Sequence, residues 1–164
     1  MNRRSPLGEA DAMQNAGLGA AIIWRFACGH SPANSAAPVP LPLILLPIPM
    51  VLHARTRSVI EGTQTASGLR KFAEKFDRDT DGLMALHGRV LRWRAVSLGA
   101  LRIAAATSLV TIVPSRAVVW PTTQSRASEA PKSVDSILRA AERIGAWCAQ
   151  LSLFEISGTL HVEF

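Results

Sequence analysis

Apolar residues recur mostly at three- and four-residue intervals along the chain, which predicts a largely helical protein. A first helix is expected within 9–30, where leucine, isoleucine and phenylalanine side chains fall near one face. Gly17 and Gly19 lie inside this pattern, and we expect them to allow close packing against another element. Together with the proline-rich run that follows, this helix forms an N-terminal segment over 12–53.

The run PVPLPLILLPIPMVLHARTR, residues 38–57, is the most apolar stretch of the chain. Its apolar part, Val39 to Leu52, is only 14 residues long, whereas a helix that crosses a bilayer needs about 20. Its prolines also remove backbone donors and free carbonyl groups that lipid cannot satisfy. We therefore interpret the run as the buried spine of a core, with no membrane span. A helical turn is expected to start at Pro42, with a straightening or kink at 47–49. An exposed connector that contains one helical turn is expected over 54–68.

The segment 66–120 predicts three helices followed by a β-hairpin. The hairpin is indicated by two runs of β-branched residues, LVTIV and AVVW, on either side of the turn-forming PSR. This order of elements is that of a winged helix without its small first strand. The helices are expected over 67–76, 79–93 and 95–108.

The C-terminal segment, 133–164, predicts one more helix with Ser133 as its N-cap and an apolar stripe that includes Trp147 and Cys148. The alternation in GTLHVEF predicts a closing strand. The fold class is therefore α+β: a mainly helical single domain over 1–164 that contains a winged-helix-like segment of three helices and a β-hairpin.

Composition narrows the class of protein. A chain of 164 residues fits one domain, and 48% hydrophobic with 18% charged residues excludes a disordered chain. Since the hydrophobic content is high for a protein that functions alone, we expect a partner to cover part of the surface. Cys28 and Cys148 have no metal-ligand spacing and indicate reduced thiols in a cytoplasmic protein.

The positive charge is concentrated in one segment. Acidic residues stop at Asp81 and resume at Glu129, and the six arginines between them carry a charge of +6, which equals the net charge of the whole chain. Such a segment favours either DNA phosphates, without sequence preference, or acidic protein surfaces, and the sequence leaves both open. The candidate binding residues are Arg89, Arg92, Arg94, Arg102 and Arg116.

No constellation of catalytic or metal-ligating residues is evident, so we expect a non-enzyme without a cofactor. The acidic run DRDTDG resembles the start of a calcium loop, but glycine stands at position 88, where that loop needs a bidentate glutamate. The histidines have no ligand spacing, and His53 is expected to be a structural residue at a helix end.

Three strings in order resemble a known family: QNAGLGAAIIWRFACGH, PLPLILLPIPMVLHARTRSVI and ILRAAERIGAWCAQ. Together they are similar to middle component three of bacterial three-component ABC systems. The LH-x-x-TR phrase of that family is matched by Leu52, His53, Thr56 and Arg57, and its G-x-W phrase by Gly145 and Trp147. Asn15-Ala16-Gly17 departs from the usual NPA by replacing its proline with alanine.

The resemblance implies a non-catalytic adaptor or scaffold subunit that acts in defence against phage or other foreign DNA. Its implied partners are an ATPase of the chromosome-maintenance class and a third subunit of the same system. An independent winged-helix regulator that binds DNA is the alternative. A partner contact is expected near the last helix, anchored by Trp147 if that side chain faces outward.

Overall fold

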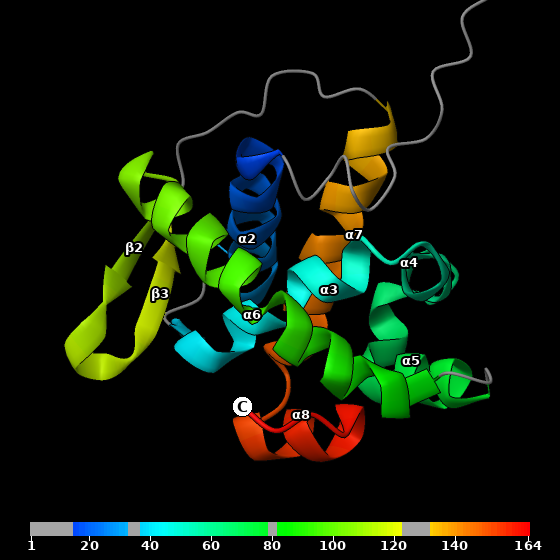
Figure 1. Ribbon diagram of the computed structural model, residues 1–164. Coiled ribbons are helices and arrows are strands. Elements are labelled where there is room, and N and C mark those ends of the chain that lie inside the picture. The colour runs from blue at the N-terminus through cyan, green and yellow to red at the C-terminus, as the bar shows by residue number, and fades with distance from the viewer. Residues whose placement is uncertain (1–14, 33–36, 79–81, 123–131) are drawn as a thin grey trace, which may run out of the picture.

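The computed structural model of the protein describes residues 15–32, 37–78, 82–122 and 132–164. Its helices pack together, and a small antiparallel sheet lies at one side of them (Figure 1). The predicted mainly helical domain with a small sheet is confirmed. The helices are α2 (Ala16–His30), α3 (Pro47–Val51), α4 (Ala54–Glu61), α5 (Gly68–Asp77), α6 (Gly82–Ala106), α7 (Lys132–Cys148) and α8 (Leu153–Leu160). The 3-10 helices are η1 (Leu41–Leu45), η2 (Thr65–Ser67) and η3 (Pro114–Arg116), and the strands are β1 (Val39–Pro40), β2 (Val110–Val113) and β3 (Val118–Pro121).

Helices α2 and α7 meet through their backbones. A Cβ added to Gly29 would lie 2.0 Å from the carbonyl oxygen of Glu142, and one added to Gly145 would lie 2.1 Å from that of Phe26. Because the obstructing atoms belong to the main chain, no side-chain movement could make room for even a methyl group. Both positions therefore require glycine, and the two helices approach as closely as helices can.

A neighbouring face of α2 packs against α6. A Cβ at Gly19 would lie 2.9 Å from the Cβ of Ala100 on α6, which confirms the expected close packing at this glycine. Gly17 differs, because its nearest neighbour is the Asn15 side chain of its own helix start. Asn15 is the N-cap of α2, and its Oδ1 accepts a hydrogen bond from the Leu18 amide at 3.0 Å.

The proline-rich spine is buried, as predicted. Leu43, Ile44, Leu46, Ile48 and Met50 are each at most 1% exposed. The expected turn at Pro42 is confirmed as part of η1. The expected straightening at 47–49 is wrong: the chain starts α3 there, because a proline in the first helical turn removes only an amide that has no partner in the helix.

The sharp change of direction comes after α3, where the axis of Leu41–Val51 and that of α4 differ by 101°. No single helix among the described residues is long and apolar enough to span a membrane. The bent pair would be, by length and composition alone. The segment 54–68 was expected to be an exposed connector with one helical turn, but its first eight residues are helix α4, whose Thr56 and Ile60 are fully buried.

The predicted hairpin is present, and the spine adds a third strand to it. β2 pairs with β3 in antiparallel register, Val110 opposite Pro121 and Val113 opposite Val118. β1 pairs with the other side of β3, so that the strand order is β1-β3-β2. The turn closes through η3 and Ala117, whose φ of 50° is left-handed.

The second and third helices expected in 66–120 are one continuous helix, α6, of 25 residues. Its buried positions Leu86, Val90, Trp93, Ser97 and Leu101 continue across the expected break at three- and four-residue spacing. No proline interrupts them, and single glycines do not end a helix that is packed on a core. The segment thus has two helices before its hairpin, not the three of a winged helix.

The C-terminal expectations were also wrong in two places. α7 begins at Lys132, so Ser133 lies inside the helix instead of capping it. The strand expected over 158–164 is absent: its first three residues complete helix α8, and residues 161–164 form neither helix nor strand. At the start of α8, Ser152 and Glu155 form a capping box, in which each side chain bonds to the backbone amide of the other. Ile156 and Leu160, four residues apart, then bury one face of this helix.

The backbone contact between α2 and α7 gives the first testable prediction. Gly145→Ala should lower the free energy of unfolding by about 2 kcal/mol or more, since overpacking costs typically ~1–3 kcal/mol even where side chains can move aside. Urea denaturation followed by circular dichroism measures the change. Gly158→Ala on α8 is the matched control, because a Cβ there meets nothing within 4 Å, and it should be neutral or stabilising. Equal stability of the two variants would contradict the requirement for glycine.

Candidate functional site

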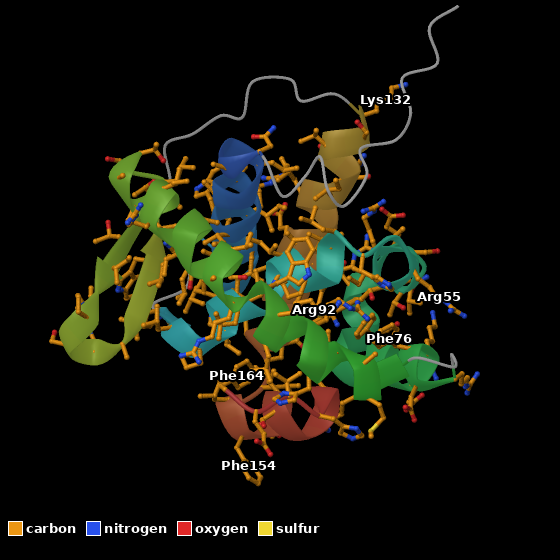
Figure 2. All side chains as sticks on the ribbon, in the orientation of Figure 1. Arg55, Phe76, Arg92, Lys132, Phe154 and Phe164 are labelled. Carbon is orange, nitrogen blue, oxygen red and sulfur yellow. The ribbon has the colours of Figure 1, made fainter. Side chains whose placement is uncertain are left out.

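The five arginines singled out in the sequence lie in three different environments. Arg92, Arg94 and Arg102 are exposed on α6, which crosses the face of the molecule turned to the viewer in Figure 2. Arg116 is also exposed, but it lies in η3 at the tip of the hairpin. Arg89 is only 8% exposed. The structure therefore groups three of the five on one helix surface and separates the other two from it.

Arg89 is part of a buried polar chain that ties α6 to α4. Its Nη1 donates a hydrogen bond at 2.8 Å to Oγ1 of Thr56, a fully buried residue 33 positions earlier. The same Thr56 Oγ1 lies 2.8 Å from Nδ1 of His53. His53 is the N-cap of α4, and its Nδ1 accepts from the Thr56 amide at 3.3 Å. The predicted structural role of His53 at a helix end is thus confirmed.

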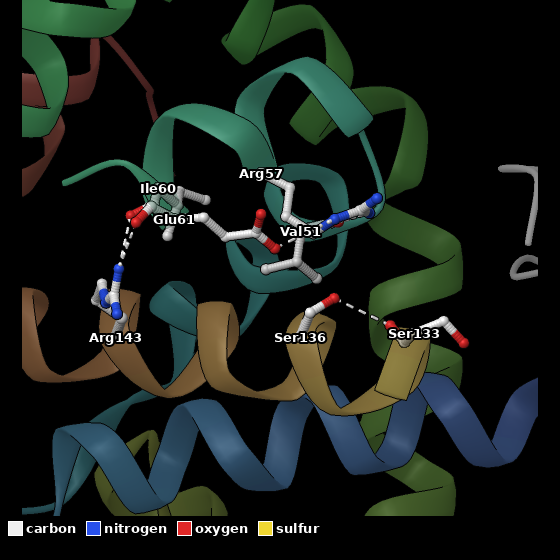
Figure 3. A network of polar contacts seen from close by, with 7 residues as sticks. All are labelled: Val51, Arg57, Ile60, Glu61, Ser133, Ser136 and Arg143. Atoms are coloured by element: carbon white, nitrogen blue, oxygen red, sulfur yellow. Dashed lines mark hydrogen bonds and ion pairs between the residues drawn. The ribbon is translucent and has the colours of Figure 1, made fainter. Parts of the chain in front are cut away.

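The remaining LH-x-x-TR residues also hold this corner of the fold. Arg57 Nη1 donates to the Val51 carbonyl at the end of α3 at 2.7 Å, and its Nε lies 3.8 Å from Glu61 (Figure 3). Leu52 is 7% exposed and continues the α3 turn by donating its amide to Ile48 O. The Arg57 side chain thus satisfies a carbonyl group at a helix end, and the Leu52 amide extends the turn before it.

Helix α7 supplies a similar cap to the end of α4. Arg143 Nη1 lies 3.0 Å from the carbonyl oxygens of Ile60 and Glu61, to which it donates (Figure 3). It lies at the same distance from the carbonyl oxygen of Thr63. Since the last carbonyls of a helix lack partners within it, a guanidinium group placed there compensates both their hydrogen bonding and the negative end of the helix dipole. The Arg143 side chain therefore has a structural role, joining α7 to the end of α4.

Trp147 faces inward, so it is not the partner anchor considered from the sequence. Its side chain is fully buried and stacks on Phe72 with the ring centroids 5.7 Å apart. Its Nε1 donates to the Thr65 carbonyl at 2.8 Å. This tryptophan connects α7 to α5 and η2, and its polar atom is satisfied within the protein.

The large apolar side chains that reach solvent lie elsewhere. Met84, Leu91 and Leu98 on α6 are 85%, 52% and 45% exposed, and Phe154 on α8 is 88% exposed. Leu91 and Leu98 were not singled out from the sequence. The signal that identifies them is their seven-residue spacing with Met84, which places all three on one face, but only once α6 is known to be continuous.

No three His, Cys, Asp or Glu side chains converge within the part of the chain that the structure describes. Asp79 and Asp81 of the calcium-loop-like run lie outside the described residues. Burial raises the pKa of the Cys28 thiol to about 11 and that of Cys148 to about 12. Both thiols are free, and at neutral pH they are held almost entirely in the protonated form, which is a poor nucleophile.

The raised thiol pKa values can be tested by labelling. At pH 7 a chromogenic disulfide reagent should react slowly with the native protein, since the reactive thiolate is scarce and Cys148 is fully buried. Cys28 should react before Cys148, and both should react at once in denaturant. Rapid labelling of Cys148 in the native state would show that this part of the core opens readily.

The two environments on α6 give a further prediction. Arg89→Ala removes a buried charge-assisted hydrogen bond and should lower the free energy of unfolding by about 2 kcal/mol. Arg92→Ala, three residues away and exposed, is the matched control and should change it by less than about 0.5 kcal/mol. Thermal or urea unfolding measures both. An Arg89→Ala protein as stable as its control would contradict the structural role of this arginine.

The sequence profile described as ABC-three component (ABC-3C) system Middle Component 3 matches residues 3–164. No curated protein and no solved structure matches the chain. The residues that carry the resemblance hold helix ends and core contacts, as described above, so they account for the fold of such a component. With a match over essentially its whole length, the chain belongs to the middle component 3 family of three-component ABC systems.

Proposed function

We propose that this protein is a non-catalytic adaptor subunit of a three-component ABC system. The observation that carries the proposal is the family match over residues 3–164, since a middle component works with the other components of its system. The proposed partners are an ATPase of the chromosome-maintenance class and the third subunit. The proposed setting is defence against phage or other foreign DNA in the cytoplasm, where the free thiols of Cys28 and Cys148 would be stable.

Two structural features support an adaptor over an enzyme. The polar groups described above, those of His53, Thr56, Arg57 and Arg143, are engaged in capping helices and joining elements. Met84, Leu91 and Leu98 on α6, in contrast, are apolar side chains exposed at the surface, as expected of a region that another protein covers. The reaction chemistry of the system would then lie in the other subunits.

Contact with DNA is the second candidate function, and the exposed arginines favour it. Arg92, Arg94 and Arg102 on α6 and Arg116 at the hairpin tip could each neutralise a phosphate. The binding would have no sequence preference, because no bidentate base reader is apparent. An independent winged-helix regulator receives less support, since the expected second and third helices are one.

Co-expression with the other two components of the same system tests the adaptor role. The three proteins should elute together in size-exclusion chromatography, because a subunit with an exposed apolar surface gains stability by covering it. The chain alone, mixed with an unrelated ATPase, is the control. A chain that stays monodisperse and separate from both components would contradict the proposal.

A further inference from the structure

Helix α6 carries an exposed apolar stripe that no element of the described chain covers. The stripe is defined by its residues at alternating four- and three-residue spacing: Met84, Gly88, Leu91, Ala95 and Leu98. This spacing keeps the residues on one face, and the stripe with Arg102 beyond it extends for about 27 Å at 1.5 Å per residue. In Figure 1 α6 lies across the front of the molecule, with α2 and α3 behind it. Both neighbours contact its opposite, buried face.

The large and small side chains of the stripe alternate as they do on helix surfaces that pack against another helix. Its large members, Met84, Leu91 and Leu98, alternate with Gly88 and Ala95, which leave depressions between them. A Cβ added to Gly88 would meet nothing within 4 Å. Alternation of large and small side chains at heptad spacing is the geometry in which the side chains of a second helix insert between those of the first.

A hollow lies beside the stripe and widens this surface. It has a volume of about 200 Å³ and is mostly apolar, with Gly19 and Ile48 on one side and Val96, Gly99 and Ile103 of α6 on the other. Because Gly99 follows Leu98 directly, the hollow opens next to the end of the stripe. It has room for one apolar side chain of a helix that lies along α6.

The charges around the stripe identify the chemistry of the partner. Successive residues of a helix are about 100° apart, so Arg92 and Arg94 lie on opposite sides of Leu91, and Arg102 lies in line with the stripe at its end. All three are exposed, and α6 contains no acidic residue from Gly82 to Ala106. The surface is therefore an apolar centre with a positive rim.

We propose that this stripe binds an acidic amphipathic helix of another component of the same system. This inference rests on the proposed adaptor function and names the surface it uses. Apolar residues of the partner helix would cover Met84, Leu91 and Leu98, and its flanking Asp and Glu side chains would pair with the arginine rim. A second copy of this chain is a poor occupant, because two such stripes would bring like charges together. DNA is also a poor occupant, since the centre of the surface is apolar where phosphates need donors.

Two variants of the full-length chain, co-expressed with the other two components, test the proposal. Leu91→Ser/Leu98→Ser removes the apolar centre, and Arg92→Glu/Arg94→Glu/Arg102→Glu reverses the rim. Each should weaken co-purification by about tenfold or more, since a few central residues dominate most interfaces. For the charge variant the loss should be largest at low salt, because screening weakens rim charges. The controls are Phe154→Ser, an even more exposed apolar residue on α8, and Lys132→Glu, an exposed cation at the start of α7.

A cross-link identifies the partner segment directly. A photoreactive residue at Leu91 should attach to an acidic amphipathic helix of one of the two components, and the same residue at Phe154 should not. Unchanged thermal unfolding of the serine and glutamate variants ensures that lost binding does not reflect lost folding.

The other outcomes overturn the inference in different ways. If wild type assembles and the stripe variants assemble equally well, the stripe is not the docking surface, although the adaptor function stands. If wild type does not assemble at all, the adaptor function fails and the inference fails with it. If assembly is unchanged but the charge variant alone loses binding to a fluorescent DNA duplex in an anisotropy salt series, the rim binds nucleic acid instead.

Discussion

The direct backbone contact between α2 and α7 is the constraint on which the rest of this fold depends. Gly29 and Gly145 let the two helices touch without intervening side chains, and this contact fixes their separation at a single value. A core packed to crystal-like density tolerates little variation in such a distance. This contact is made by main-chain atoms, which cannot rearrange as side chains do. It therefore fixes the positions of the side chains that α2 and α7 direct to either side, among them Phe26 and Trp147.

The spine enters the space that these helices define. Its 3-10 turn and α3 are short, with five residues each, and neither would be stable alone, because isolated helices shorter than about 12 residues are marginal in water. Two arginines from flanking helices then satisfy the carbonyls at the ends of α3 and α4: Arg57 bonds to Val51, and Arg143 bonds to the last residues of α4. The short apolar helices are thus stabilised at their ends by the long side chains of Arg57 and Arg143, which the fold in turn holds in place.

Much of the fold could be predicted where the local pattern agreed with the tertiary structure. The burial of the spine, the amphipathic helix α5 and the hairpin all follow from composition and periodicity within about 15 residues. The continuity of α6 could not be predicted in the same way, because Gly88, Gly99 and the two exposed arginines Arg92 and Arg94 weaken the pattern locally. Packing on α2, η1 and α3 maintains the helix across them. The strand β1 was missed for a related reason, since its pairing partner is nearly 80 positions away.

The candidate site, too, could be predicted from the sequence only in part. The positive charge of the segment around α6 could be predicted from the sequence alone, and three of its arginines do share a surface. The inward position of Arg89 could not, because it depends on Thr56 being brought to it by α4. Trp147 shows the same limit: a tryptophan near a chain end suits an exposed anchor and a core residue equally well until the neighbouring Phe72 is known.

The spine's prolines have a consequence for how the small sheet meets other proteins. Leu41 donates its amide inward to the carbonyl of Ala117, the residue just before β3, and β1 pairs in register with Val39 opposite Val119. In an antiparallel pair the inward and outward amides alternate, so the outward positions of this edge are 38 and 40, and both are proline. The outer edge of β1 therefore has carbonyl groups but no amide donors. Such an edge cannot template an additional strand, which protects the sheet against strand addition and edge-to-edge aggregation on that side.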